Sequence, residues 1–292
     1  MKKIFDGVGV AIVTPFLNGK VDYDSMGKLV DKSINDGADA IIALGTTGEG
    51  STIGILERKK IIEFCKSRIG KRAKLIIGTG NNNFKTCLKY TKMARDLGAD
   101  GALVVTPYYN KTTQQGLIQY YALLSNLKFP LIMYNVPSRT GLNIDTNTVC
   151  KIIETNPYVY GIKESTTDIN RIMKLHEICK DKIAVYSGED SLNHIFYYLG
   201  SSGCISVTAN ILTREVKEIF KYSRQNNPLS LAKQNNIQKI NESLFIETNP
   251  IPIKNLLFKK GLISSSEVRM PLIELTHQNN PIISSIADEL NL

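Results

Sequence analysis

The hydrophobic pattern along the chain is a series of short apolar runs separated by segments with helical spacing. Each run is nearly continuous in apolar residues instead of alternating, which is typical of parallel strands that are covered on both faces. The pattern therefore predicts eight strands, at residues 7–15, 40–45, 75–80, 101–107, 131–137, 159–165, 183–188 and 203–210.

Helical spacing is clear in two of the intervening segments, residues 25–37 and 84–98. Each places apolar side chains on one face: Met26, Leu29, Val30 and Ile34 in the first, and Leu88, Met93 and Leu97 in the second. Eight strand–helix units of this kind predict an α/β fold, a (β/α)8 TIM barrel. An open doubly wound sheet is the alternative, but the regular units and the helical pattern that follows them favour a closed barrel.

The domain organisation follows from where the strand pattern stops. We expect a (β/α)8 catalytic barrel over residues 1–226 and a C-terminal helical extension over residues 227–292, packed on the barrel. Helical patterns at residues 229–244 and 252–260 support the extension. No low-complexity tract or flexible linker separates the two parts, so one compact body is expected.

Composition excludes several classes of protein. The five cysteines are scattered and odd in number, which argues against a disulfide framework and fits a reducing, cytoplasmic location. The three histidines have no metal-ligand spacing. Lys2 and Lys3 precede an apolar stretch, but Asp6 and Pro15 interrupt it, so it reads as a first strand instead of a signal peptide. No segment has the apolar length that a membrane span needs.

The net charge of +9 raises the possibility of a nucleic-acid partner. The basic residues are spread singly and in pairs, without an arginine-rich run, so no nucleic-acid binding is expected. The charge is compatible with small anionic substrates that are steered toward a positive opening.

Lys163 lies within the apolar run of residues 159–165, where an unpaired charge is unfavourable. A buried lysine that stays charged and dry costs several kcal/mol, and loss of its proton leaves a nucleophilic amine. Such an amine forms Schiff bases with carbonyl compounds. The ordinary alternative is a lysine at a strand end that reaches water.

Polar residues gather where the predicted strands end, the position of catalytic residues in such barrels. They lie at residues 45–49, 106–110 and 134–141. In a closed barrel we expect them to meet Lys163 on one face. A glycine-rich turn exposes N–H groups that can hold a carboxylate, a tyrosine phenol can move protons, and Arg139 offers a forked cation for a second carboxylate. Taken singly, a tight turn, packing aromatics and a surface arginine remain the plain interpretations.

These motifs resemble the dihydrodipicolinate synthase family, also called 4-hydroxy-tetrahydrodipicolinate synthases, within the pyruvate-dependent class I aldolase and N-acetylneuraminate lyase superfamily. The resemblance covers residues 7–252 and is carried by Gly-Thr-Thr-Gly-Glu at 45–49, Tyr-Asn-Val-Pro-Ser-Arg-Thr-Gly at 134–141, Gly-Ile-Lys-Glu at 161–164, Ser-Gly at 187–188 and Ile-Ser-Val-Thr-Ala-Asn at 205–210.

The resemblance implies a Schiff-base condensation of pyruvate with L-aspartate 4-semialdehyde, on the route to diaminopimelate and lysine. It implies no metal or organic cofactor, because the lysine itself is the electron sink. The implied catalytic residues are Lys163, Tyr134, Thr46 and Tyr109, the last contributed by a neighbouring subunit. The implied substrate-binding residues are Thr47 and the backbone of Ile205 for the pyruvate carboxylate, Arg139 for the semialdehyde, and Gly188.

Two other functions stay open on this scaffold. N-acetylneuraminate lyases and keto-deoxy sugar-acid aldolases resemble the chain in the lysine, the tyrosine and the barrel, but usually lack the arginine at the position of Arg139. A catalytically silent barrel that binds a keto acid is the second alternative, since fold alone does not dictate function.

Assembly and regulation are also implied only by the resemblance. A tyrosine acting in a neighbouring subunit implies at least a dimer, and the family usually forms a homotetramer that is a dimer of dimers. Lysine-sensitive members carry a histidine and a glutamate where this chain has Ile55 and Thr86. We therefore expect weak or absent feedback inhibition by lysine.

Overall fold

The computed structural model describes residues 1–290 and contains a closed barrel of eight parallel strands. Around the barrel the order is β1, β10, β9, β8, β7, β6, β5 and β4, so each strand pairs with its neighbours in the chain. The strands are β1 (Gly7–Ala11), β4 (Ala40–Ala43), β5 (Lys74–Gly78), β6 (Gly101–Val105), β7 (Leu131–Asn135), β8 (Val159–Glu164), β9 (Ala184–Ser187) and β10 (Gly203–Ser206). The predicted TIM barrel is confirmed.

Each predicted strand extends beyond the strand that forms. Val13 and Val207 show why, because both are buried in the core without belonging to a strand. Apolar character therefore continues into the loops at the carboxyl ends of the strands. A short hairpin of β2 (Phe16–Leu17) and β3 (Lys20–Val21), which the apolar pattern did not predict, follows β1.

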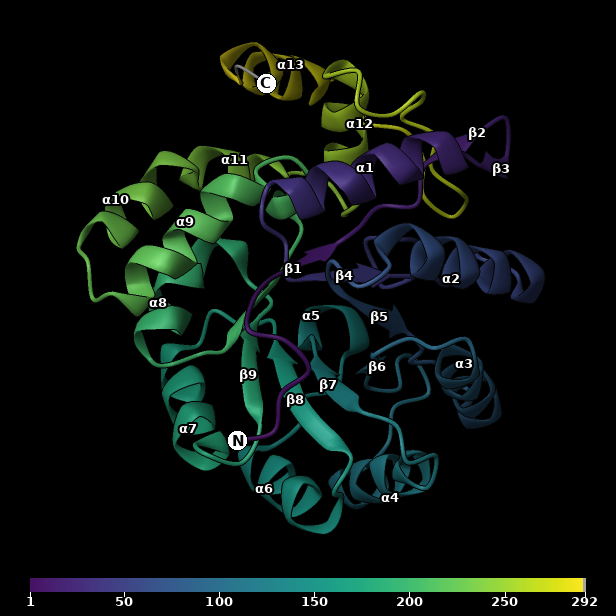
Figure 1. Cartoon of the computed structure of the whole chain (residues 1–292), viewed down its shortest axis with the longest axis vertical. Helices are drawn as coiled ribbons and strands as arrows, with labels where there is room; N and C mark the ends of the chain where they lie inside the picture. The colour runs from purple at the N-terminus through teal and green to yellow at the C-terminus, as the bar shows by residue number, and fades with distance from the viewer. Residues whose placement is uncertain (291–292) are drawn as a thin grey trace.

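Helices cover the outside of the barrel (Figure 1). They are α1 (Tyr23–Asn35), α2 (Ile55–Ile69), α3 (Phe84–Asp96), α4 (Gln114–Ser125), α6 (Thr146–Thr155), α7 (Ile169–Cys179), α8 (Asn193–Tyr198) and α9 (Thr213–Arg224), with the short α5 (Pro137–Thr140) after β7. In α1 the predicted face is correct, with Met26, Leu29 and Val30 buried.

The face predicted for α3 is shifted. Cys87, Thr91 and Ala94 are the buried residues of this helix, whereas Leu88, Met93 and Leu97 are partly buried and pack against the edge of the core. Spacing of four and three residues puts Cys87, Thr91 and Ala94 on one stripe. The stripe that meets the strands is thus built from small side chains, which the apolar pattern understates.

Beyond α9 the described part of the chain contains helices and no strand, with an irregular stretch over residues 261–279. It forms α10 (Leu229–Asn236), α11 (Gln238–Ser243), α12 (Ile251–Lys259) and α13 (Asn280–Glu289), and the predicted boundary after residue 226 lies between α9 and α10. The single pattern predicted over residues 229–244 is two helices, because the backbone leaves helical geometry at Ile237 (φ −104°, ψ 5°).

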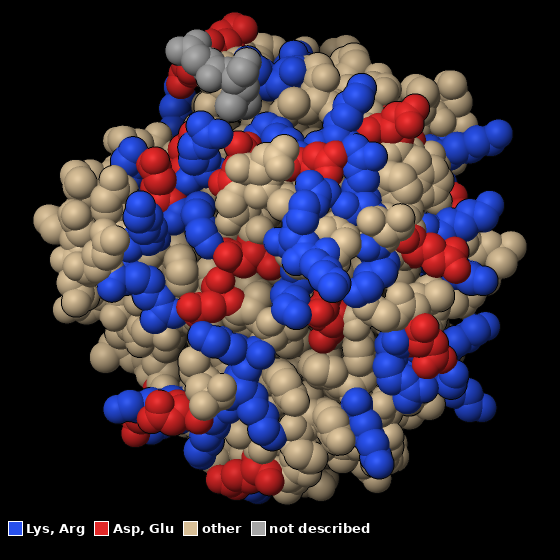
Figure 2. Space-filling model, viewed as in Figure 1, with Lys and Arg blue, Asp and Glu red and all other residues tan. Residues whose placement is uncertain are grey.

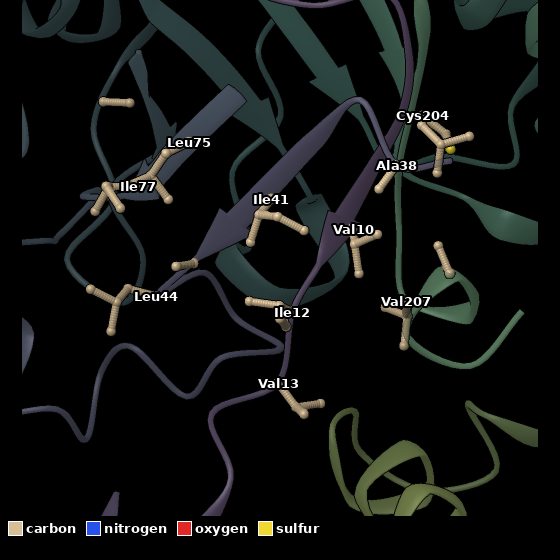
Figure 3. Close-up of a cluster of buried hydrophobic side chains, with 14 of the residues drawn as sticks. Val10, Ile12, Val13, Ala38, Ile41, Leu44, Leu75, Ile77, Cys204 and Val207 are labelled. Carbon is tan, nitrogen blue, oxygen red and sulfur yellow. The ribbon is translucent and has the colours of Figure 1, made fainter. Parts of the chain in front are cut away.

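Two hydrophobic cores result from the alternation of side chains along the strands. Ile41 faces the helices and Ile42 faces the barrel interior. Figure 3 shows part of the outer core. There Val10 of β1, Ile12 just after β1 and Ile41 of β4 lie together.

The amino end of the barrel is closed by the N-terminal segment, which crosses in front of the strands in Figure 1. The ring of Phe5 stacks on that of Tyr186 with 4.4 Å between centroids. The Tyr186 hydroxyl donates a hydrogen bond of 2.8 Å to the Phe5 carbonyl. Access to the barrel interior is therefore from the carboxyl end.

On the face shown in Figure 2, Lys and Arg side chains are interspersed with Asp and Glu. Among residues 1–290, no helix combines the length and the apolar character needed to cross a membrane. The same residues contain no cluster of three His, Cys, Asp or Glu side chains that could hold a metal ion.

Candidate active site

A cavity of about 600 Å³ opens at the carboxyl end of the barrel. Its walls come from the chain after β4, from β7, from α5, from β8 and from the turn after β9. The structure brings six of the predicted site residues together here: Thr46, Thr47, Tyr134, Arg139, Lys163 and Gly188.

Lys163 lies on β8 with only 6% of its surface exposed. No carboxylate oxygen of residues 1–290 lies within 4 Å of its Nζ, so its charge has no ion-pair partner in the described chain. Tyr134 is its partner in the register of β7 and β8, and Nζ lies 4.5 Å from the centroid of the Tyr134 ring. The amine and the phenol are thus held side by side by the sheet itself.

Gly188 makes room for the lysine side chain. A Cβ atom at this position would lie 2.6 Å from Lys163 Cε and 2.2 Å from Ser165 Oγ. Real Cβ atoms do not approach other atoms so closely, so any larger residue would displace Lys163. The resemblance of the motifs implied a substrate contact for Gly188; the structure adds this steric reason for a glycine.

The carboxylate next to Lys163 in sequence is kept away from it. Glu164 points to the outside of the barrel, where Arg171 Nη2 donates to its Oε2 at 2.9 Å and Asn135 Nδ2 donates to both oxygens. Burial raises the pKa of the Glu164 carboxyl, and the Arg171 charge opposes this rise. Strand alternation therefore pairs Glu164 with Arg171 and leaves Lys163 unpaired.

The loop of residues 45–50 is tightly folded, which requires a glycine at position 50. A Cβ on Gly50 would lie 2.1 Å from the Leu44 carbonyl oxygen. Glu49 has a left-handed backbone (φ 49°), and its buried carboxylate accepts hydrogen bonds from Lys254 Nζ at 2.7 Å and from the Arg269 N–H at 2.8 Å. Arg58 donates to the Gly50 carbonyl at 2.6 Å from beneath. The loop is both a tight turn and a fixed support for Thr46 and Thr47.

Arg139 lies on the rim of the cavity, at the third position of α5. Its Nη2 donates a hydrogen bond of 3.2 Å to the Asn249 carbonyl oxygen. The guanidinium keeps further N–H donors for an anion.

The comparisons with known proteins identify the family of the chain. The model of the dihydrodipicolinate synthetase family matches residues 4–290. The chain belongs to the dihydrodipicolinate synthetase family. It is 40% identical over 290 residues to the 4-hydroxy-tetrahydrodipicolinate synthase of Clostridium novyi, with 99% of this chain and 97% of that protein covered. It is 42% identical over 285 residues to the enzyme of the same name from Thermodesulfovibrio yellowstonii, covering 97% of each.

Solved structures of the family superpose closely on the chain. Dihydrodipicolinate synthase from Aquifex aeolicus gives a TM-score of 0.96 at 38% identity, with 99% of both chains covered. The enzyme from Acinetobacter baumannii, whose structure is a complex with pyruvate, gives 0.95 at 40% identity, with 98% of both chains covered. The family resemblance inferred from the motifs is confirmed.

Two implied residues of the dihydrodipicolinate synthetase site lie outside the cavity. Tyr109, after β6, is 91% exposed and has a left-handed backbone (φ 68°). Ile205 is buried in β10, and its side chain belongs to the core inside the barrel. Their assigned roles stay predictions, as do those of the residues in the cavity; the role of Tyr109 requires a second subunit, and that of Ile205 uses a backbone atom.

Asn249 is a residue that the motif analysis did not single out. It lines the cavity, and its Nδ2 donates a hydrogen bond of 3.0 Å to Thr47 Oγ1. It belongs to the chain between α11 and α12, far from the barrel loops in sequence. Only its place in the sequence shared with the family, just before Pro250, could have drawn attention to it.

Proposed function

We propose that the chain is a 4-hydroxy-tetrahydrodipicolinate synthase, which condenses pyruvate with L-aspartate 4-semialdehyde on the route to diaminopimelate and lysine. One observation carries the proposal. Lys163 is a buried amine with no carboxylate partner in the described part of the chain, beside a phenol, in a cavity that also presents two threonines and an arginine.

The first half of the reaction takes place on pyruvate. Lys163 Nζ attacks the keto carbon, and loss of water gives an imine between nitrogen and that carbon. The protonated imine withdraws electrons, so the methyl carbon loses a proton and an enamine forms. Tyr134 supplies and removes protons in these steps, and Thr46 passes them onward.

The second half joins the two substrates. The enamine carbon attacks the aldehyde carbon of the semialdehyde, and the aldehyde oxygen takes up a proton. The amino group of the semialdehyde then attacks the imine carbon and displaces Lys163, which closes the ring and frees the enzyme. No redox step is involved, so the residues account for the chemistry without an organic cofactor.

Each carboxylate has its own binding groups in this proposal. Thr47, the backbone of Ile205 and the turn at Gly188 receive the carboxylate of pyruvate. Arg139 receives that of the semialdehyde, because a planar guanidinium forms paired hydrogen bonds with a carboxylate. Arg139 also favours the synthase over aldolases of the same scaffold that act on polyhydroxylated sugar acids.

The active form in this proposal is a homo-oligomer, a tetramer built as a dimer of dimers. Tyr109 would complete the proton relay of a neighbouring subunit. Its 91% exposure supports this role, since an aromatic side chain so exposed is typical of interfaces.

The decisive experiment is reduction of the protein with borohydride in the presence of pyruvate, followed by peptide mass spectrometry. We expect one reduced pyruvate adduct, on Lys163. Condensation with aspartate 4-semialdehyde, and no cleavage of N-acetylneuraminate, would then select the synthase. Folded protein that forms no adduct would contradict the Schiff-base mechanism and favour a silent keto-acid-binding barrel.

A further inference from the structure

The contacts of Asn249 indicate a function beyond packing. We infer that Asn249 is a positioning residue, which turns the Thr47 hydroxyl proton into the cavity and fixes the Arg139 guanidinium on its rim. It would thereby set the affinity for the two substrate carboxylates from outside the barrel. The inference rests on the function proposed above and deepens it.

The hydrogen bond between Asn249 and Thr47 runs from the amide to the hydroxyl as the amide is oriented in the structure, where Asn249 Oδ1 is buried without a partner among residues 1–290. The amide Nδ2 can only donate, so Thr47 Oγ1 is the acceptor of this 3.0 Å bond. Thr47 Oγ1 has no other hydrogen-bond partner among residues 1–290, and its side chain lines the cavity. The hydroxyl hydrogen is therefore free to be donated to a group in the cavity. A carboxylate is the acceptor that would form the strongest hydrogen bond with it.

The same residue acts on the other carboxylate site through its backbone. The Asn249 carbonyl oxygen accepts from Arg139 Nη2 at 3.2 Å. This contact uses one N–H of the guanidinium and leaves the others for substrate. A single residue thus lies between the group assigned to pyruvate and the group assigned to the semialdehyde.

The segment that carries Asn249 is anchored independently. Lys254, four residues after Pro250, is fully buried and pairs with Glu49 at 2.7 Å. Glu49 belongs to the same loop as Thr47, so two contacts join the loop and the segment side by side. Asn249 is itself only 5% exposed. The segment that carries the Asn249 amide is therefore held by contacts that do not depend on substrate.

The test is Asn249→Asp, which keeps the shape and removes the donor. An aspartate would accept the Thr47 proton, turn it away from the cavity and place a negative charge near pyruvate. We expect the pyruvate concentration for half-maximal borohydride trapping to rise on the order of tenfold or more. The rise should grow with pH as the new carboxyl ionises, a trend that a packing defect would not produce.

Two further variants keep the test valid if the aspartate perturbs folding. Asn249→Ala frees the Thr47 hydroxyl to rotate, so we expect a smaller rise, and almost none when Thr47→Val has already removed the hydroxyl. Asn235→Asp is the matched control, because Asn235 is exposed on α10 and the change of side chain is the same. Unfolding curves of all variants report their folding.

The outcomes separate the two proposals. The inference would be overturned if Asn249→Asp needed the same pyruvate concentration as the wild type for half-maximal trapping. It would also be overturned if the increases caused by Asn249→Ala and Thr47→Val simply multiplied in the double variant. In either case the imine mechanism would stand. Absence of any trapped pyruvate in the wild-type protein would overturn the proposed function instead.

Discussion

Two lysines are buried among residues 1–290, and their surroundings differ in a way that distinguishes a proposed catalytic lysine from a structural one. Lys254 lies where α12 meets the loop after β4, is completely buried and pairs with Glu49 at 2.7 Å. Its Nζ also lies 4.1 Å from the centroid of the Phe16 ring. Lys163 lies in the barrel cavity, is almost as buried, and has no carboxylate within 4 Å in the described chain.

Burial alone is therefore no sign of a catalytic lysine in this fold. Burial lowers the pKa of Lys254, and the charge and hydrogen bond of the Glu49 carboxylate oppose that effect. An ammonium in an ion pair has no free lone pair and cannot attack a carbonyl. Absence of a carboxylate partner among residues 1–290 is what distinguishes Lys163, the proposed nucleophile, from the structural Lys254.

The largest expected effect is that of Lys163→Met on activity. Loss of the nucleophile should lower kcat on the order of 10⁴-fold or more, as for other covalent catalysts, and abolish trapping of pyruvate by borohydride. Thermal unfolding should stay unchanged or move upward, because a buried unpaired amine is removed. Residual synthase activity within a hundredfold of the wild type would contradict the assignment of Lys163 as the nucleophile.

Lys254→Met should have the opposite profile. It leaves Glu49 buried without its partner, which costs about 3–5 kcal/mol in the free energy of unfolding. Urea denaturation measures this loss. The double variant Lys254→Met with Glu49→Gln should recover much of the stability, since the remaining carboxamide carries no charge; the absence of any recovery would show that the ion pair is not the cause.

Tyr134→Phe refines the description of the cavity. It keeps the ring beside Lys163 and removes the phenolic hydroxyl. Proton transfer by a positioned side chain contributes about 10²–10⁴-fold to rate, so kcat should fall by that range while Lys163 still captures pyruvate. Loss of capture itself would mean that Tyr134 acts on the lysine and not on the proton transfers.

His176 tests, on a weaker base, the rule that burial disfavours the charged form of a side chain. Burial lowers its pKa from 6.5 to about 4, and Ser201 Oγ lies 2.9 Å from its Nε2. The unfolded chain then takes up a proton below pH 6.5 that the native protein refuses until about pH 4. Stability should therefore decline as the pH falls through this window, by about 3 kcal/mol at most.

The matched variant for this prediction is His176→Gln, which retains a partner for Ser201. Urea denaturation at a series of pH values should show a shallower decline for the variant than for the wild type. Identical curves would assign the acid sensitivity to other groups.

The smallest expected effect concerns free lysine, an ammonium that would need a partner of its own. Ile55 begins α2 and Thr86 lies in the first turn of α3, and neither carries a charge. Lysine should therefore inhibit the condensation weakly or not at all. The double variant Ile55→His with Thr86→Glu should increase inhibition; half-inhibition of the wild type at submillimolar lysine would contradict the prediction.

Sequence reasoning located Lys163 because its signal is local. A charge inside an apolar strand is visible in a few consecutive residues, and strand order then places the ends of β4, β7 and β8 at one rim. The barrel fold could be predicted equally well, since its eight apolar runs are regularly spaced. The shifted face of α3 shows the limit of this approach, because small buried residues such as Thr91 do not stand out as hydrophobic.

The structural roles of Lys254 and Asn249 could not be predicted from the sequence in this way. Lys254 lies in an amphipathic segment where a lysine normally reaches solvent. Its partner Glu49 is 205 residues away, and Thr47 is 202 residues from Asn249. Only the folded chain shows that these residues meet, so pairing across such distances could not be inferred from spacing.

The same long-range contacts bear on how the protein is made. Synthesis proceeds from the N-terminus, and the loop with Thr47 and Glu49 leaves the ribosome long before Asn249 and Lys254 exist. Until then Glu49 has no ammonium to neutralise it and Thr47 has no amide to orient it. A growing chain should therefore remain inactive through most of translation, and should acquire its pyruvate site only when almost the whole polypeptide has emerged.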